Sequence, residues 1–141
     1  MAATDHRGVV LLSIKPRFAE AIMRGEKRVE FRRRPWKSDV GTVVVYSTSP
    51  ARKIVGYFTV TFVQLASPDR LWREHGGVGA IARHEYRDYY AGAAVGVAVG
   101  VGAVHRLRSE KRLQSVTGLQ KPPQSFAYLD QATLSRLHAL S

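Results

Sequence analysis

The spacing of hydrophobic residues changes several times along this chain, and each change predicts a new strand or helix. Residues 9–14 form an apolar run rich in β-branched side chains, which is typical of a buried strand. Residues 16–25 begin with a proline, carry apolar side chains on one helical face and end with a glycine, so they predict a short helix. Strands are again predicted over residues 42–47 and 53–65.

The second half of the chain has shorter helices and more glycine. Helices are predicted over residues 70–75 and 81–90, a long strand over residues 93–107, and a terminal helix after Asp130, whose side chain is a good N-cap. Gly56 inside a strand predicts a bulge or a sharp bend. Together these elements predict an α+β domain of mostly antiparallel strands with short peripheral helices, a pattern that suits a small closed β-barrel.

The length of 141 residues fits one domain. We expect a flexible N-terminus over residues 1–8, the folded domain over residues 9–129 and a C-terminal helix over residues 130–141. The longest apolar run, residues 91–104, is too short and too rich in glycine to cross a membrane. The polar N-terminus lacks the apolar core of a secretory signal, so we expect a cytoplasmic protein.

The chain is strongly basic. It has 22 Lys and Arg against 11 Asp and Glu, a formal net charge of +11, and residues 1–53 alone carry +7 (12 against 5). A field of this sign attracts polyanions: RNA is favoured, DNA is the second choice, and a membrane is disfavoured because no basic amphipathic helix is visible. Cysteine is absent and the histidines show no metal-ligand spacing, so no metal or cofactor is expected. The oligomeric state stays open.

The densest charge lies in residues 24–37, which hold seven Lys or Arg and two Glu. Val29 and Phe31 alternate with charged residues there, so the apolar pair is expected to face the core and the charged residues to face outward. Lys27 and Glu30, three positions apart, would meet only if the chain bends between them. One interpretation is a solvated charged face; the other is a surface for phosphates and bases, which clustered Arg and nearby aromatic residues favour.

Several ordered motifs resemble those of the ASCH domain family over about residues 9–129. They are SIKP at 13–16, GEKRVEFR at 25–32, YSTSP at 46–50, IVG at 54–56 and PPQSFAYL at 122–129. The resemblance implies a PUA-like β-barrel with a cleft between the barrel and the first helix. RNA, a nucleotide or a modified base would bind in that cleft.

Some members of this family are ribonucleases, and the resemblance implies which residues would act here. That branch uses a Tyr at a strand end, a Lys shortly after it and a Ser near the C-terminal loop. Tyr46 and Ser125 match, but the position of the Lys, six residues after Tyr46, is Arg52, with Lys53 beside it. Because Arg does not release its proton, Lys53 or Lys27 would have to transfer protons in a metal-independent cleavage.

Another branch hydrolyses the amide of N4-acetylcytidine with a Lys, a Thr and a later Glu. Lys27 matches the Lys and Glu85 is the match for the Glu, but Glu30 stands at the position of the Thr, so the nucleophile is missing. The function expected first is therefore binding of RNA or of a modified nucleotide. Ribonuclease activity is the alternative, and amide hydrolysis is less favoured than either.

Cations, hydroxyls and one carboxylate make up the expected nucleic-acid-binding set: Lys15, Lys27, Glu30, Arg32, Arg34, Tyr46, Ser47, Thr48, Ser49, Arg52, Lys53 and Ser125. If the protein is an enzyme, the expected catalytic residues are Lys27, Tyr46, Lys53 and Ser125. The hydroxyls of residues 46–49 suit phosphate contacts at a strand end, and ordinary turn chemistry is their other interpretation.

Overall fold

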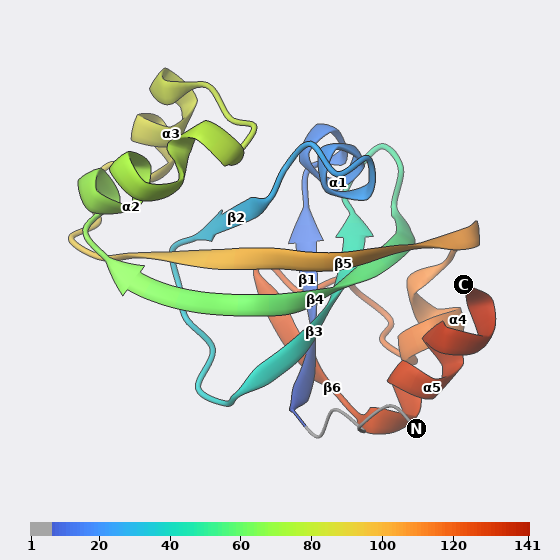
Figure 1. The fold of residues 1–141 in the computed structure, drawn as a ribbon. Helices are drawn as coiled ribbons and strands as arrows, with labels where there is room; N and C mark the ends of the chain where they lie inside the picture. The colour runs from blue at the N-terminus through green and yellow to red at the C-terminus, as the bar shows by residue number, and fades with distance from the viewer. Residues whose placement is uncertain (1–6) are drawn as a thin grey trace.

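A twisted sheet of six strands organises residues 7–141, which are the residues that the computed structural model describes (Figure 1). The strands are β1 (Gly8–Ile14), β2 (Val29–Arg32), β3 (Val40–Ser47), β4 (Lys53–Ala66), β5 (Gly96–Lys111) and β6 (Phe126–Leu129). The helices are α1 (Pro16–Met23), α2 (Pro68–His75), the 3-10 helix η1 (Gly76–Val78), α3 (Arg83–Tyr89), α4 (Leu113–Thr117) and α5 (Gln131–Leu140).

The strands follow the order β2-β5-β4-β3-β1-β6, and β1 and β3 are the parallel pair in an otherwise antiparallel sheet. The closed barrel expected from the sequence is not confirmed, because no backbone pairing joins the outer strands β2 and β6 among residues 7–141. The Arg32 side chain at the end of β2 instead donates hydrogen bonds to the backbone oxygens of Ser13 in β1 and Ser125 just before β6. A side chain therefore connects the two edges that a closed barrel would join through its backbone.

The central strand β1 is covered on both faces, which explains its continuous apolar sequence. Its residues alternate between two hydrophobic clusters: Val10 and Leu12 pack with α1, and Val9 and Leu11 pack with α4 and α5. Both neighbouring strands add alternate side chains to the same clusters. A third cluster joins β2 to α2 and α3.

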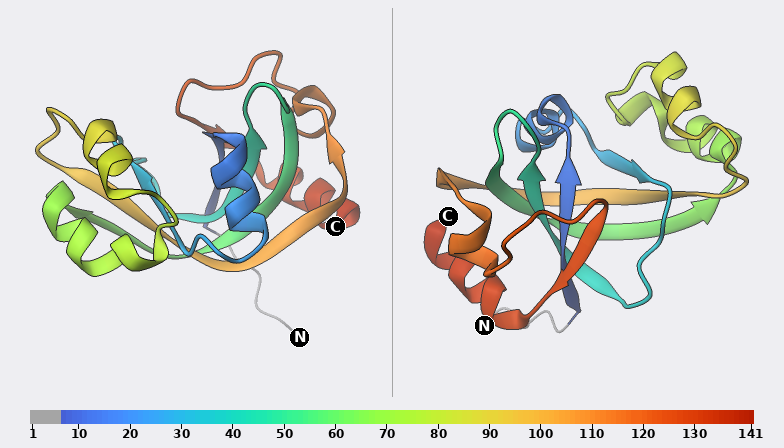
Figure 2. Two further views of the ribbon diagram at one scale, coloured as in Figure 1. Left: turned by 90° about the horizontal axis from the view of Figure 1, so that it is seen from above. Right: turned by 180° about the vertical axis from the view of Figure 1, so that it is seen from behind.

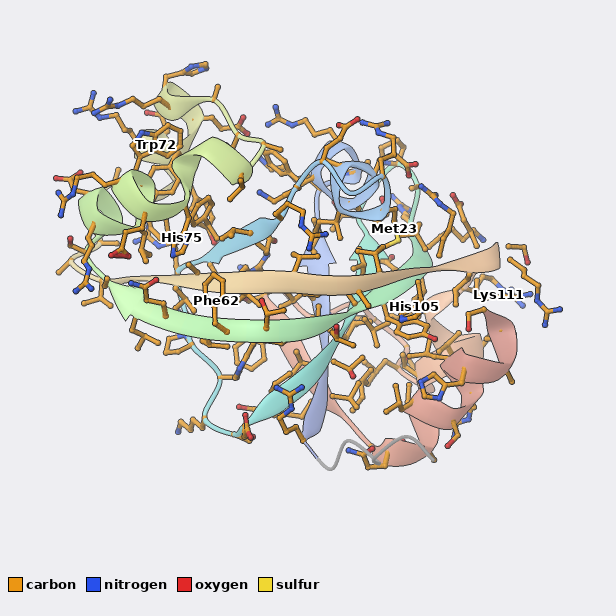
Figure 3. All side chains as sticks on the ribbon, viewed as in Figure 1. Met23, Phe62, Trp72, His75, His105 and Lys111 are labelled. Atoms are coloured by element: carbon orange, nitrogen blue, oxygen red, sulfur yellow. The ribbon has the colours of Figure 1, made fainter. Side chains whose placement is uncertain are left out.

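Helix α1 follows the local signals closely. Pro16 occupies its first turn, where a missing N–H is tolerated, and Gly25 just after its end has φ of +79°, a value that favours a residue without Cβ. Gly56 lies at a register shift in β4, and a Cβ there would stand 2.4 Å from the oxygen of His105 and 2.5 Å from the sulfur of Met23. Figure 3 shows Met23 and His105 close to β4 and β5. The bulge predicted at Gly56 is thus confirmed, and the glycine is required by close packing.

Helices α2 to α5 lie at the two ends of the long strands β4 and β5. Helices α2 and α3 form a lobe at one end, and α4 and α5 lie at the other (Figures 1 and 2). The lobe connects β4 to β5, and its aromatic residues Tyr86 and Tyr90 are buried, as their helical spacing predicts, whereas Tyr89 is 36% exposed. No helix among the described residues is both long and apolar enough to cross a membrane.

Two expected boundaries differ from those observed. The strand expected over residues 93–107 is β5, which begins at Gly96 and runs on to Lys111, and the helix expected over residues 81–90 is limited to α3. The flexible terminus expected over residues 1–8 lies mostly outside the described residues, but Gly8 already belongs to β1.

Candidate functional site

A cleft of about 1130 Å³ opens beside the end of β1. Its walls come from β1 and α1, from β2 and the segment after it, from α3, and from the segment that leads into β6. Five cations and three carboxylates line it: Lys15, Lys27, Arg32, Arg33, Arg34, Glu30, Glu85 and Asp88. Aromatic side chains from α1, β2, α3 and β6 complete it: Phe18, Phe31, Tyr89 and Phe126.

Lys27 and Glu30 meet at the base of this cleft, with 3.6 Å between Nζ and the nearer carboxylate oxygen. The bend that this contact requires is present because β2 begins only at Val29. Arg28, just before it, donates its backbone N–H to the oxygen of Val78. Lys27 is 1% exposed and Glu30 is 5% exposed. The outward position expected for Glu30 from the alternation is therefore wrong, and both faces of β2 are covered.

The lysine is held by more than its carboxylate partner. Lys27 Nζ donates a hydrogen bond to the backbone oxygen of Gly79, and it lies over the rings of Phe18 and Phe31, 4.9 and 5.5 Å from their centres. Burial lowers the pKa of Lys27 below its ordinary value, and the adjacent Glu30 carboxylate opposes this shift. A buried ammonium in an aromatic cage is thus stabilised by one carboxylate, one carbonyl and two rings.

Arg32 links this pair to the C-terminal segment. One guanidinium nitrogen lies 3.2 Å from the second carboxylate oxygen of Glu30, and the other donates to the hydroxyl of Ser125 at 3.1 Å. The Nε of Arg32 is buried and has no hydrogen-bond partner among the described residues. A buried donor left without an acceptor is unfavourable by about 1–3 kcal/mol, so an acceptor group beside it would be stabilised.

The rim of the cleft is more exposed than its base. Lys15 and Arg34 are exposed, and no carboxylate among the described residues pairs with either of them. Arg33 donates to the backbone oxygens of Tyr89 and Ala91 and so connects the strand to α3. The exposed cations Lys15 and Arg34 are therefore available to an anion that enters the cleft.

Some expected site residues lie elsewhere. Tyr46 is 5% exposed and packs in the cluster that faces α4 and α5, and Ser47 is buried. Lys53 opens β4 opposite Ser47, and exposed Arg52 precedes it in the β3–β4 turn. Neither Tyr46 nor Ser47, Ser49, Arg52 or Lys53 lines the cleft. The cleft does bring together the other expected residues: Lys15, Lys27, Glu30, Arg32, Arg34, Thr48 and Ser125.

Sequence reasoning missed the aromatic walls and one backbone acceptor. The helical pattern places Phe18 on the apolar face of α1 and does not show that its ring lies beside Lys27. The carbonyl of Gly79 contacts Lys27 across 52 positions of the chain, and no local pattern announces such a contact. Phe126 directly follows the expected site residue Ser125, and this adjacency is a sequence signal that Phe126 lies at the cleft.

The sequence matches the ASCH domain family over residues 12–101. It is 28% identical over 144 aligned positions to a protein from Zymomonas mobilis named "ASCH domain-containing ribonuclease", covering 100% of this chain and 97% of the relative. It is also 31% identical over 121 positions to a protein from Ureaplasma parvum named "Large ribosomal subunit protein uL22". That match covers 85% of this chain and only 39% of the relative.

Solved structures agree with this assignment. A crystal structure of an ASCH protein from Zymomonas mobilis has a TM-score of 0.85 and 26% identity, covering 94% of this chain and 95% of that one. A serine-to-alanine variant from the same organism gives 0.86 with 97% of this chain covered. The N-terminal domain of McrB from Staphylothermus marinus, at 6% identity and a TM-score of 0.54, shares the fold alone. This chain belongs to the ASCH domain family.

Proposed function

We propose that this protein binds single-stranded RNA and holds one nucleotide of it in the cleft beside β1. The observation that carries the proposal is the buried network of Lys27, Glu30 and Arg32, which combines two cations with one carboxylate on the wall of the cleft. The free Nε–H of Arg32 supplies a donor for a phosphate or base oxygen. Protein groups already occupy both oxygens of Glu30, so we assign this residue to orienting the cations.

The exposed cations at the rim suit the backbone of the bound strand. Lys15 and Arg34 both line the cleft, one just before α1 and one after β2. The net charge of +11 would draw a polyanion toward the molecule, and these two residues would then contact phosphates beside the bound nucleotide. Affinity is therefore expected to fall as salt rises.

A binding measurement with two charge-matched double variants tests this assignment. Lys15→Ala with Arg34→Ala removes two exposed cations of the cleft; Arg73→Ala with Arg87→Ala removes two exposed cations of the α2–α3 lobe that do not line it. Fluorescence anisotropy with labelled single-stranded RNA is expected to show a loss of at least about tenfold for the first variant only. The slope of log affinity against log salt should also decrease by about 1.4, at about 0.7 per phosphate contact.

Equal losses in both variants would show that net charge alone attracts RNA and that the cleft is not the binding site. Absence of binding by the wild-type protein to any RNA would overturn the proposal altogether. A competition with single-stranded DNA of the same sequence separates the two polyanions, and RNA is expected to compete better.

Metal-independent cleavage of RNA is the second candidate. The relative from Zymomonas mobilis that aligns over the whole chain is named a ribonuclease, which favours this activity. Solved structures from that organism also include variants at a serine and at a tyrosine, the residue types of Ser125 and Tyr46. Ser125 lines the cleft, whereas Tyr46 and Lys53 do not, so the geometry supports binding better than cleavage.

A gel assay with labelled RNA in EDTA distinguishes the two candidates. An intact RNA after prolonged incubation supports binding alone. Fragments in EDTA that disappear in both Ser125→Ala and Tyr46→Phe, while anisotropy still detects binding, would establish the ribonuclease instead.

A further inference from the structure

Three aromatic rings continue outward from the cleft along β6 and the segment that faces it. Phe126 lines the cleft, and its ring meets the rings of Trp36 and Tyr128 edge to face, at 6.0 and 5.5 Å between ring centres. Trp36 and Phe126 are partly buried against the core, whereas Tyr128 is 49% exposed. We call these three residues the aromatic ledge.

The backbone fixes the positions of these rings. Phe126 and Tyr128 belong to β6 and pair with Leu12 and Val10 of β1, so both side chains lie on the same face of the edge strand. The hydroxyl of Tyr128 accepts a hydrogen bond of 2.7 Å from the backbone N–H of Lys37. A ring that is already ordered loses little conformational freedom when a flat ligand stacks on it.

Packing explains the inner side of the ledge but not its exposed side. Trp36 and Phe126 contribute to the hydrophobic cluster beneath α1, which accounts for their burial. Tyr128 stands at the edge of the sheet with half of its surface in solvent. Exposed aromatic rings beside cations are typical of surfaces that bind single-stranded nucleic acid, because every base offers a face for stacking.

The charge beside the ledge fits the same ligand. Residues 33–39 carry Arg33, Arg34 and Lys37 against Asp39, a net charge of +2. Arg34 and Lys37 are exposed, and neither forms an ion pair with a described residue. Arg34 lines the cleft and the backbone N–H of Lys37 donates to Tyr128, so a basic residue stands at each end of the path from the cleft to the ledge.

We infer that the aromatic ledge is a second base-binding subsite, on which the base next to the cleft nucleotide stacks while Arg34 or Lys37 contacts the phosphate between them. This inference rests on the proposed RNA binding and adds a position and a ligand chemistry to it. The protein would thus recognise at least two consecutive nucleotides, one inside the cleft and one on the ledge.

Tryptophan fluorescence tests the ledge directly. The chain has two tryptophans, and Trp72 lies in the α2–α3 lobe (Figure 3), so Trp72→Phe leaves Trp36 as the one tryptophan. A titration with a short single-stranded RNA is expected to change the Trp36 emission. The same RNA with one abasic nucleotide placed next to the bound base should bind with on the order of tenfold lower affinity, because one stacked base is lost.

A pair of aromatic variants provides the matched comparison. Tyr128→Ala removes the exposed ring of the ledge, and Phe62→Ala removes a ring of β4 that is 36% exposed and does not line the cleft. Tyr128→Ala is expected to lower RNA affinity by on the order of tenfold and to abolish the difference between the intact and abasic RNAs. Phe62→Ala should bind both RNAs as the wild-type protein does.

The outcomes separate this inference from the function on which it rests. If the wild-type protein binds RNA but intact and abasic RNAs bind equally and Trp36 emission does not change, the ledge is not a base subsite and the cleft proposal stands. If Tyr128→Ala and Phe62→Ala weaken binding equally, the ledge is likewise rejected. If no RNA binds at all, both proposals fail.

Discussion

Removing the charge of Lys27 should destabilise the folded protein, although its side chain could contact RNA. Lys27→Met keeps the unbranched apolar stem between Phe18 and Phe31 but deletes the ammonium that lies 3.6 Å from the Glu30 carboxylate. Loss of one partner of a buried ion pair is unfavourable by about 3–5 kcal/mol. Glu30 retains Arg32 at 3.2 Å, so we expect a smaller loss, about 2–3 kcal/mol of the free energy of unfolding.

Substitution of the carboxylate partner, Glu30, should lower the free energy of unfolding more than Lys27→Met does. Glu30→Gln leaves the buried ammonium of Lys27 and the guanidinium of Arg32 without the carboxylate that both contact, so we expect a loss of about 3–5 kcal/mol. The double variant should then lose at least about 1 kcal/mol less than the sum of the single variants, because the two residues interact directly. Urea denaturation followed by circular dichroism measures the free energies of unfolding of the three variants, and these are compared at the same dependence of free energy on urea concentration.

The pH dependence gives an independent check. Burial lowers the pKa of Lys27, so the unfolded chain binds this proton more tightly than the folded protein does. Between the lowered pKa and the ordinary value of 10.5, the contribution of Lys27 to the free energy of unfolding must therefore rise with pH. The difference in unfolding free energy between wild type and Lys27→Met should therefore grow as the pH rises from this lowered pKa toward 10.5.

Two results would refute this reasoning. Single variants that each change the free energy of unfolding by less than about 0.5 kcal/mol would mean that Lys27 is solvated. Strictly additive losses would mean that Lys27 and Glu30 do not interact in solution.

Three further substitutions probe the scaffold. Phe31→Ala should lower the free energy of unfolding by about 3–5 kcal/mol because the ring is buried, and a silent result in urea denaturation would contradict this burial. Gly56→Ala should lower the melting temperature, with a loss of about 1–3 kcal/mol, since its Cβ would overlap His105 and Met23; unchanged melting would disprove the close approach. Tyr46→Phe should change stability by less than about 0.5 kcal/mol, because the hydroxyl forms no hydrogen bond among the described residues; a larger loss in denaturation would reveal a missing partner.

Structure that depends on near neighbours could be predicted from the sequence. Ser67 accepts from the backbone N–H of Arg70, and Asp130 accepts from that of Thr133, so each cap is visible within three positions. The apolar run of residues 9–14 corresponds closely to β1, because a strand buried on both faces needs no polar alternation.

The site could be predicted only in part, because its contacts join distant segments. Lys27 contacts Gly79 across 52 positions and Arg32 contacts Ser125 across 93, and alternation around Phe31 says nothing about what covers the other face of β2. The position of Tyr46 was missed for a similar reason: a tyrosine at a strand end suggests a site, but strand register turns its ring toward α4 and α5.

Strand β6 determines how far the C-terminal end of the chain can be shortened, because it covers the outer edge of β1. The family match ends at residue 101, inside β5, and the following 40 residues supply the rest of that strand and all of β6. A fragment that ended there would uncover the outer edge of β1, where residues 9–12 are four consecutive apolar side chains without a charge or a proline. Such an edge is a template for pairing with another chain, so the shortened fragment would aggregate even if its remaining strands folded.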